Sequence, residues 1–289
     1  MKILSHYKKL KFFFFQQFSK FLVSVNSKSK YVRGLYGLTY QVYPRSALDN
    51  HIIKNGILPD YICLTNQLKF SKKSIFFDVG ANAGFVACVL AKKYASKGKV
   101  HAYEPDPQCF KQLTENKKIN SLNNLELHQI ALQDDHYKMR IPLFIRRLVD
   151  GDLMENRGLS SIFNIKLGAK NKNFVDSSTI DNEVKRLNIN RIDFIKIDVE
   201  GGEFFVIQGA LKSICKFYPT ILYEYSNVID KLTKTKNTQQ TFNLLKKLGY
   251  IQFLIDKEIS LIYLPKYSSQ LGNINILAFH QTKLPIFLR

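Results

Sequence analysis

Acidic side chains and glycines recur in this sequence where short apolar runs end. One apolar run, residues 75–77, ends in Asp78, and a second run ends in Glu104. Gly80 and Gly84 lie between them, and a helix-like segment follows. Sites for adenosine-containing ligands typically show, in this order, a strand, a glycine turn, a helix, a second strand and an acid. The segment therefore predicts such a site at the end of a parallel sheet.

Three features of this segment indicate the kind of ligand. Gly80 and Gly84 carry no Cβ, so the turn can tighten and its backbone can approach the ligand. Glu104 comes 20 positions after Gly84, a spacing that lets an acid reach ribose hydroxyls. The turn lacks the G-x-G-x-x-G pattern of dinucleotide sites, and Asp78 would repel a pyrophosphate. These features favour S-adenosylmethionine (SAM), which carries an amine and a sulfonium but no phosphate, over NAD.

Acids also stand at the ends of the next three apolar runs. Asp134 follows the third run, Asp198 and Glu200 follow the fourth, and Glu224 ends the fifth. The carboxyl ends of parallel strands meet at one edge of a sheet, so we expect these side chains to gather there. Glu203 has a second explanation, because an acid at a helix amino-terminus favours the helix dipole without any catalytic role.

The elements that would position these acids alternate between strands and helices. We expect strands at residues 75–79, 99–104, 125–131, 192–198, 220–225, 250–255 and 274–280. Helices are expected between them, at residues 84–96, 106–119, 180–187, 202–215 and 238–248. Strands separated by helices predict an α/β fold with a parallel, doubly wound, Rossmann-like sheet.

The motifs at these strand ends also occur together in a known family. The runs FDVGANAGF, EPDP, ALQD, STID, IKIDVEGGE and ILYEY, within residues 70–226, resemble the FkbM-type family of class I SAM-dependent methyltransferases. The resemblance implies a seven-stranded sheet of order 3-2-1-4-5-7-6, with the last strand antiparallel. It also implies SAM as the cofactor and O-methylation of a hydroxyl on a sugar, glycan or related metabolite.

The resemblance assigns cofactor-binding roles to six residues, which are Asp78, Gly80, Asn82, Gly84, Glu104 and Asp134. The first four would shape the pocket for the methionine end of SAM. Glu104 would accept hydrogen bonds from the ribose hydroxyls. Asp134 lies where such folds hold the adenine amino group.

Three further carboxylates are candidates for catalysis, namely Asp198, Glu200 and Glu224. The first two would lie beside the sulfonium and face the acceptor. A sugar hydroxyl is a poor acid, so a carboxylate would take its proton late, as the new bond forms. Alternatively, a divalent cation held by Asp198 and Glu224 would lower the pKa of the hydroxyl. Oxygen ligands favour Mg²⁺ over zinc, and the sequence leaves both routes open.

Two other functions agree with parts of the sequence. The net charge of +20, from 43 basic and 23 acidic residues, indicates attraction to an anionic partner. A lysine-rich, solvated surface explains the charge equally well. A nucleic-acid methyltransferase is disfavoured because no N-P-P-Y-like tetrapeptide follows the fourth strand. A catalytically silent SAM-binding module is the remaining alternative.

The cysteines and histidines give no sign of a metal centre or a disulfide framework. The four cysteines form no C-x-x-C pair, and the six histidines are scattered without metal-site spacing. We expect buried thiols in a reducing compartment, and therefore a cytoplasmic protein. Hydrophobic residues make up 45% of the chain, which is enough for a substantial core.

We expect the chain to divide into a helical extension at residues 1–72 and, as the resemblance implies, a methyltransferase domain at residues 73–289. The first 30 residues are basic and aromatic, and their longest apolar run, Phe12–Phe15, is too short to span a bilayer. As an amphipathic helix, this segment would pack on the domain or lie on the inner face of an anionic membrane. The sequence does not decide between these two positions.

The acceptor is expected to bind the least regular part of the chain, residues 133–178. Long insertions after a strand are where substrate-binding loops tend to lie. Four arginines there, Arg140, Arg146, Arg147 and Arg157, would hold an anionic group of the acceptor or simply remain solvated. Ser160 and Ser161 are further candidates for contact with the acceptor.

Overall fold

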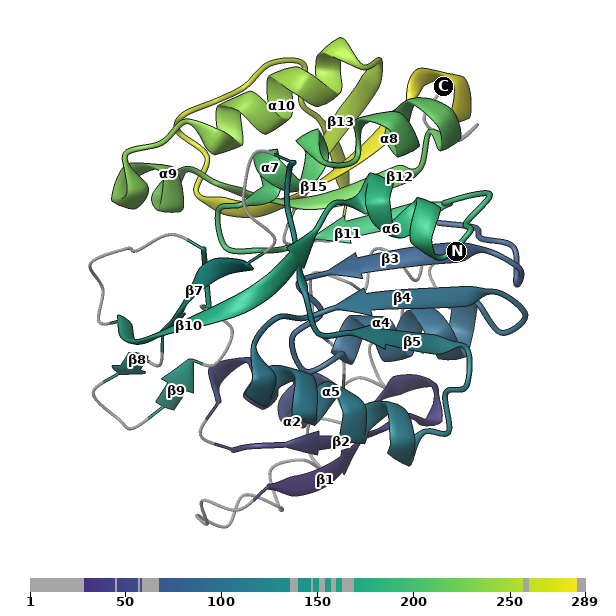
Figure 1. Cartoon of the computed structure of the whole chain (residues 1–289), viewed down its shortest axis with the longest axis vertical. Coiled ribbons are helices and arrows are strands. Elements are labelled where there is room, and N and C mark those ends of the chain that lie inside the picture. The colour runs from purple at the N-terminus through teal and green to yellow at the C-terminus, as the bar shows by residue number, and fades with distance from the viewer. Residues whose placement is uncertain are drawn as a thin grey trace.

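An eight-stranded sheet forms the centre of the protein in a computed structural model (Figure 1). The structure describes residues 29–44, 46–56, 58, 68–135, 140–146, 148–150, 154–156, 160–162, 169–256 and 260–284. The strands lie in the order β5-β4-β3-β11-β12-β15-β13-β14. Their bounds are β3 (Ile75–Val79), β4 (Lys99–Tyr103), β5 (Leu125–His128), β11 (Phe194–Ile197), β12 (Thr220–Ser226), β13 (Tyr250–Ile255), β14 (Leu261–Tyr263) and β15 (Asn273–His280).

The predicted α/β fold class is confirmed, with one difference in the sheet. Strands β5, β4, β3, β11 and β12 are parallel, and β15 runs antiparallel to both β12 and β13. The short strand β14 pairs with the outer side of β13, so the sheet has eight strands where seven were expected. Because β14 has only three residues, it is too short to show a strand period in the sequence.

Helices cover both faces of the sheet. One hydrophobic cluster contains Phe76 and Val100 of the sheet. Three helical segments pack into it, namely α4 (Phe85–Val89), the π-helix η3 (Leu90–Tyr94) and α5 (Pro107–Ile119). The other cluster holds Phe77, Ile195 and Ile221. It also receives side chains from α6 (Ile180–Arg186), α7 (Glu203–Gln208), α8 (Leu211–Phe217) and α10 (Asn237–Lys247). Neighbours Phe76 and Phe77 fall in different clusters because successive strand residues point to opposite faces.

The part of the expected helical extension that the structure describes also contains strands. Strands β1 (Lys30–Arg33) and β2 (Thr39–Val42) form an antiparallel hairpin around a short 3-10 turn, η1 (Leu35–Gly37). Helix α2 (Ala47–Asn55) follows. The hairpin is fixed to α5, since Asn120 Oδ1 accepts a hydrogen bond from the Thr39 backbone at 2.8 Å. Residues 1–28 lie outside the described residues, and the boundary near residue 72 stays a prediction.

The segment at residues 133–178, expected to be irregular, contains a long antiparallel pair. Strand β7 (Arg140–Arg146) pairs with β10 (Ala169–Ser178), which also pairs in parallel with β6 (Ala131–Leu132). A smaller hairpin joins β8 (Leu148–Asp150) to β9 (Met154–Asn156). In Figure 1 these strands lie beyond the left edge of the main sheet. Polar residues such as Asn171 and Asn173 within β10 concealed the strand in the sequence.

Two smaller expectations can be compared with the structure. Among the described residues, no helix has both the length and the apolar character needed to cross a bilayer. Cys88 and Cys109 are buried thiols as expected, but Cys215 is exposed. Cys215 lies on the side of α8 that faces away from the sheet, whereas Ile214 and Phe217 face the core.

The turn after β3 brings two strand ends unusually close together. Gly80 has a φ of +74°, and a Cβ placed there would lie 1.8 Å from the backbone oxygen of Asp198. A Cβ on Gly84 would lie 2.2 Å from Leu113 Cδ1. Because both glycines lack a Cβ, other parts of the chain can pack directly against this turn. The sequence had suggested the approach of a ligand as the reason.

We predict that Gly80→Ala destabilises the protein far more than Gly37→Ala. Gly37 has a similar φ of +72°, but a Cβ there would meet nothing within 4 Å. Gly37→Ala should therefore cost only the backbone strain, about 1–2 kcal/mol. Gly80→Ala should cost roughly 3 kcal/mol or more, because the obstructing atom is backbone.

Urea unfolding followed by circular dichroism measures both values. Equal losses of unfolding free energy in the two variants would contradict the close approach of Gly80 to Asp198.

Candidate functional site

A cavity of about 320 Å³ lies at the carboxyl ends of β4, β3 and β11. Small-molecule sites are typically of about 300–1,000 Å³. The cavity is lined mainly by the segments after these strands, at Val79–Asn82, Tyr103–Pro105 and Asp198–Glu200. Ile130, Ala131 and Leu132 add an apolar wall, and Leu48 and His51 of α2 add another. The cavity thus combines acidic side chains with apolar surface suited to a flat ring.

The insertion closes part of this cavity through two serines. Ser160 Oγ donates a hydrogen bond to Asp106 Oδ2 at 2.8 Å, and Ser161 Oγ donates to the backbone oxygen of Glu200, also at 2.8 Å. Ser161 also exchanges backbone hydrogen bonds with Phe144 of β7. Both serines line the cavity, so the insertion is tied to the ends of two different strands.

A buried ammonium group belongs to Lys196, which is one of the residues that line the cavity. Lys196 Nζ lies 3.2 Å from Asp78 Oδ1 and 3.4 Å from Asp198 Oδ2, and it donates a 2.6 Å hydrogen bond to the Gly80 oxygen. Asp78 is fully buried, and the side chain of Lys196 is 4% exposed. Burial alone lowers the pKa of Lys196, but the charges of Asp78 and Asp198 outweigh it and raise that pKa overall.

This ion pair changes the explanation for Asp78. From the sequence, the Asp78 carboxylate was expected to select a cationic ligand, yet Asp78 does not line the cavity and its charge faces Lys196. Burial raises the pKa of Asp78, and Lys196 partly offsets that effect. The pairing follows from register, since Lys196 of β11 lies beside Asp78 of β3 in the parallel ladder. Asp78 is therefore placed to hold Lys196.

Glu104 lines the cavity at the end of β4. Its Oε2 accepts a hydrogen bond from the Asn82 backbone at 2.7 Å, and its Oε1 accepts one from the Asp106 backbone at 2.8 Å. Burial raises the pKa of Glu104 to about 7. The two backbone N–H groups and the Lys196 charge act in the opposite direction, while the Asp106 charge raises the pKa further.

Three carboxylates converge next to the cavity at the ends of β11 and β12. One oxygen each from Asp198, Glu200 and Glu224 lies within 4.8 Å of the other two. Glu224 Oε2 is buried without a hydrogen-bond partner. Burial raises the pKa of Glu224 well above its ordinary value, and the charges of Glu200 and Asp198 raise it further. Crowded acids of this kind repel one another and favour a cation among them.

The turn that carries Glu200 is held by a fourth acid. Glu200 has a φ of +56°, and Gly201 follows with a φ of +99°. Glu203 Oε1 accepts hydrogen bonds from the backbone of Val199 at 3.0 Å and Gly201 at 3.3 Å. Burial raises the pKa of Glu203 to about 7. These contacts agree with the structural explanation for Glu203, as a residue that shapes the turn.

A comparison with protein families shows which family the chain belongs to. Residues 78–251, more than half of the chain, match the family described as Methyltransferase FkbM domain. The chain belongs to this family. The resemblance found in the motifs is therefore confirmed, and the matched region includes every predicted site residue from Asp78 to Glu224.

Individual relatives match only in part. Methyltransferase 1 of Beauveria bassiana is 22% identical over 149 residues, which are 48% of this chain and 59% of that protein. Methyltransferase sdnD of Sordaria araneosa is 26% identical over 153 residues, or 46% of this chain and 58% of that protein. The matches thus span less than two thirds of the length of these curated relatives.

Among solved structures, a methyltransferase FkbM from Methylobacillus flagellatus aligns with a TM-score of 0.45 and 15% identity. It covers 81% of this chain and 53% of its own. An O-methyltransferase from Bacillus cereus, in complex with SAH, aligns with a TM-score of 0.45 and 13% identity over 77% of this chain and 80% of its own.

The predicted site residues of this FkbM-family chain fall into two groups. Those that line the cavity are Gly80, Asn82, Glu104, Asp198 and Glu200. Those that do not are Asp78, Gly84, Asp134 and Glu224, of which Glu224 still reaches the acid cluster. Asp134 is buried beside the cavity wall, two positions after Leu132. The roles assigned to all of these residues stay predictions.

Several cavity residues were not predicted from the sequence. Tyr103 precedes Glu104 by one position, so its place at the strand end was a usable signal. Lys196 was noted without a role, because its partners depend on strand register. Of the four arginines expected to meet the acceptor, Arg140 forms a surface ion pair with Asp176 at 3.4 Å and is not in the cavity lining. The side chain of Arg146 lies outside the described part of the structure. Arg147 and Arg157 lie outside the described residues.

We predict that Lys196→Met lowers the free energy of unfolding by about 3–5 kcal/mol, because it leaves the buried Asp78 carboxylate unpaired. Adding Asp78→Asn should recover part of that loss. Arg191→Met is the matched control. It breaks the Arg191–Asp193 pair, whose side chains are 49% and 20% exposed, so it should cost less than about 1 kcal/mol. Chemical denaturation of the four proteins tests this, and similar losses for Lys196→Met and Arg191→Met would contradict it.

Proposed function

We propose that this chain transfers the methyl group of SAM to a hydroxyl of a sugar, glycan or related metabolite. One observation carries the proposal: the cavity is lined by Glu104 at one strand end and by Asp198 and Glu200 at another, with Glu224 completing a crowded group of three carboxylates. A ligand that is both a nucleoside and a cation matches these two ends. Membership of the FkbM methyltransferase family supports the same reaction.

The nucleoside would bind between Glu104 and the apolar wall. Each carboxylate oxygen of Glu104 accepts one backbone N–H, and this fixes the orientation of the carboxylate. An ionised carboxylate accepts about four hydrogen bonds in all, so one lone pair on each oxygen remains for a pair of ribose hydroxyls. Ile130 and Leu132 provide apolar surface for the adenine, and Tyr103 provides an aromatic ring beside it.

The cationic end would bind near Asp198 and Glu200. Both line the cavity, as does Lys196, whose ammonium group is paired with Asp78 and Asp198. A sulfonium and an ammonium group placed among the three acids would relieve their mutual repulsion. The same electrostatic argument disfavours a dinucleotide, since a pyrophosphate would add negative charge to the cluster.

When bound, SAM supplies a methyl group on a positively charged sulfur. The acids then have two tasks, to hold the acceptor hydroxyl in line with that methyl group and to take its proton as the oxygen–carbon bond forms. Positioning of this kind contributes roughly 7–11 kcal/mol to a reaction of two substrates. Asp198, Glu200 and Glu224 are the candidate bases, and together they would also hold a divalent cation such as Mg²⁺.

An acceptor of another class remains the main alternative. The net charge of +20 would suit a nucleic acid. The three acids beside the cavity favour a hydroxyl acceptor, because they accept protons and repel phosphates. Nucleic-acid methylation and SAM binding without catalysis are the two alternatives to the proposed reaction.

We predict that SAM binds more weakly at low pH because of Glu104. The pKa of this carboxyl is raised to about 7, and ribose hydroxyls donate to its ionised form. Binding should therefore release a proton below pH 7, and Kd should rise roughly tenfold between pH 8 and pH 6. Calorimetry across this range measures the effect. Glu104→Gln should bind more weakly at every pH with a flat profile, and an equally steep profile in that variant would contradict the assignment.

We also predict that Asp198→Asn and Glu200→Gln separate binding from turnover. Each should weaken SAM binding several-fold through loss of charge, and loss of the base should reduce methyl transfer about 10²–10⁴-fold. Labelled SAM is incubated with an extract of glycans, lipids and RNA, with and without Mg²⁺, and the labelled fraction is identified. Glu115→Gln, an acid of α5 outside the cavity lining, is the control and should retain full turnover.

The labelled fraction distinguishes the three functions. Label in alkali-stable sugar ethers supports the proposal. Label in the RNA fraction, removed by nuclease, would replace it with nucleic-acid methylation. SAM binding without transfer to any fraction would indicate a binding module, and unchanged turnover in Asp198→Asn would refute the catalytic role of that residue.

A further inference from the structure

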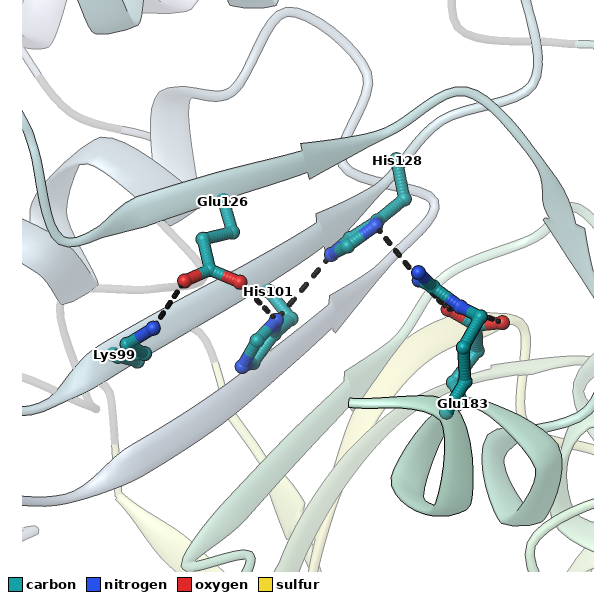
Figure 2. Close-up of polar contacts among 6 residues, drawn as sticks. Lys99, His101, Glu126, His128 and Glu183 are labelled. Atoms are coloured by element: carbon teal, nitrogen blue, oxygen red, sulfur yellow. Dashed lines mark hydrogen bonds and ion pairs between the residues drawn. The ribbon is translucent and has the colours of Figure 1, made fainter. Parts of the chain in front are cut away.

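A second cluster of ionisable side chains lies on the sheet, apart from the cavity (Figure 2). His101 of β4 and Glu126 of β5 are cross-strand neighbours, and His128 follows Glu126 by two positions on the same face. One ligand atom from each of the three lies within 4.8 Å of the other two. The sequence gave no metal-site spacing for these histidines, because strand register brings them together.

The distances within this cluster match a metal site. His101 Nδ1 lies 3.3 Å from His128 Nε2 and 3.3 Å from Glu126 Oε2. In a tetrahedral zinc site with bonds of about 2.0–2.2 Å, neighbouring ligand atoms are separated by about 3.3–3.6 Å. Two of the three ligand-to-ligand distances therefore already have the length that such a site requires.

Hydrogen bonds among these side chains cannot give every polar atom of the cluster a partner of the right kind. The Arg186 guanidinium, which has only donors, lies 3.4 Å from His128 Nδ1. Neutral His128 then carries its proton on Nε2 and donates it to His101 Nδ1. The lone pair of His101 Nδ1 is used in that bond, so Glu126 Oε2, 3.3 Å away, meets a second acceptor. A proton on His101 Nδ1 would satisfy Glu126 but would clash with the proton of His128.

A metal ion resolves this conflict because it accepts lone pairs from all three atoms. Zinc binds the neutral imidazole, and the His101 side chain is only 3% exposed. Lys99 pairs with Glu126 Oε1, which leaves Oε2 directed at His101. His128 would carry its proton on Nδ1, and the half-exposed Arg186 would withdraw from that atom while it keeps its ion pair with Glu183.

We propose that His101, Glu126 and His128 form a binding site for a divalent transition-metal ion, and that their donor set favours zinc. Two imidazoles and one carboxylate form a zinc-type ligand set, with a fourth position for water. The site differs in chemistry from the acids at the cavity, whose oxygen ligands favour Mg²⁺. It is also connected to the cavity, since the His128 ring stacks on Tyr103 with centroids 4.5 Å apart, and Tyr103 lines the cavity.

The test is equilibrium dialysis of the chelator-treated full chain against Zn²⁺, with an excess of Mg²⁺ present. We expect one zinc per chain, a higher melting temperature with zinc, and the visible absorption of tetrahedral Co²⁺ when cobalt replaces zinc. His128→Gln and Glu126→Gln should each weaken zinc binding at least about tenfold. The Glu126 side chain is 33% exposed, so Glu126→Gln is not expected to disturb folding.

Three further variants make the result specific. Arg186→Gln replaces a donor-only group with one that can accept the His128 Nδ1 proton, so it should tighten zinc binding several-fold. His51→Gln, at an exposed histidine of α2, and Asp198→Asn, in the acid cluster, should leave zinc binding unchanged. Equal zinc binding by wild type, His128→Gln and Glu126→Gln would overturn the proposal, as would loss of zinc in His51→Gln or Asp198→Asn.

Discussion

The ammonium group of Lys196 is the interaction on which the rest of the site depends. It lies between two carboxylates, Asp78 and Asp198, and it also donates to the backbone of Gly80. An isolated charge buried to this degree would cost several kcal/mol, so the lysine and Asp78 require each other. Through these contacts, a single side chain joins the ends of β3 and β11 at the floor of the cavity.

The glycine turn is what makes this connection sterically possible. The backbone oxygen of Asp198 occupies the space where a Cβ of residue 80 would lie. The ion pair and the close approach therefore act together, and both fix Asp198 relative to the turn that carries Asn82. Asn82 in turn donates its backbone N–H to Glu104, so the end of β4 is linked to the same turn.

Electrostatics divides this part of the molecule into two zones. Below the floor, Asp78 is compensated by Lys196, whereas Asp198, Glu200 and Glu224 crowd together beside the cavity. The raised pKa values of Glu104 and Glu224 both arise first from burial, which is the cost of holding these acids ready for a ligand. On the sheet face that carries Tyr103, the histidine cluster differs in composition, with two imidazole rings and one carboxylate.

Much of this protein could be predicted from its sequence. The apolar runs and glycines located β3 at its observed bounds, and the helix expected at residues 106–119 corresponds to α5, which Asp106 caps and Pro107 begins. Such features are local, because hydrophobic period and helix caps depend on neighbours in the chain. The placing of Gly80, Glu104 and Asp198 at one cavity was also predictable, since parallel strands end on the same edge of a sheet.

Only the tertiary structure decided how those residues are used. The sequence could not show that Asp78 faces Lys196, because that contact depends on the register of two strands more than a hundred residues apart. Register likewise brought His101 to Glu126, and packing turned the missing Cβ of Gly80 toward Asp198. Local patterns determine which elements form and where they end, but partners across strands are set by register and packing, which no short stretch of sequence specifies.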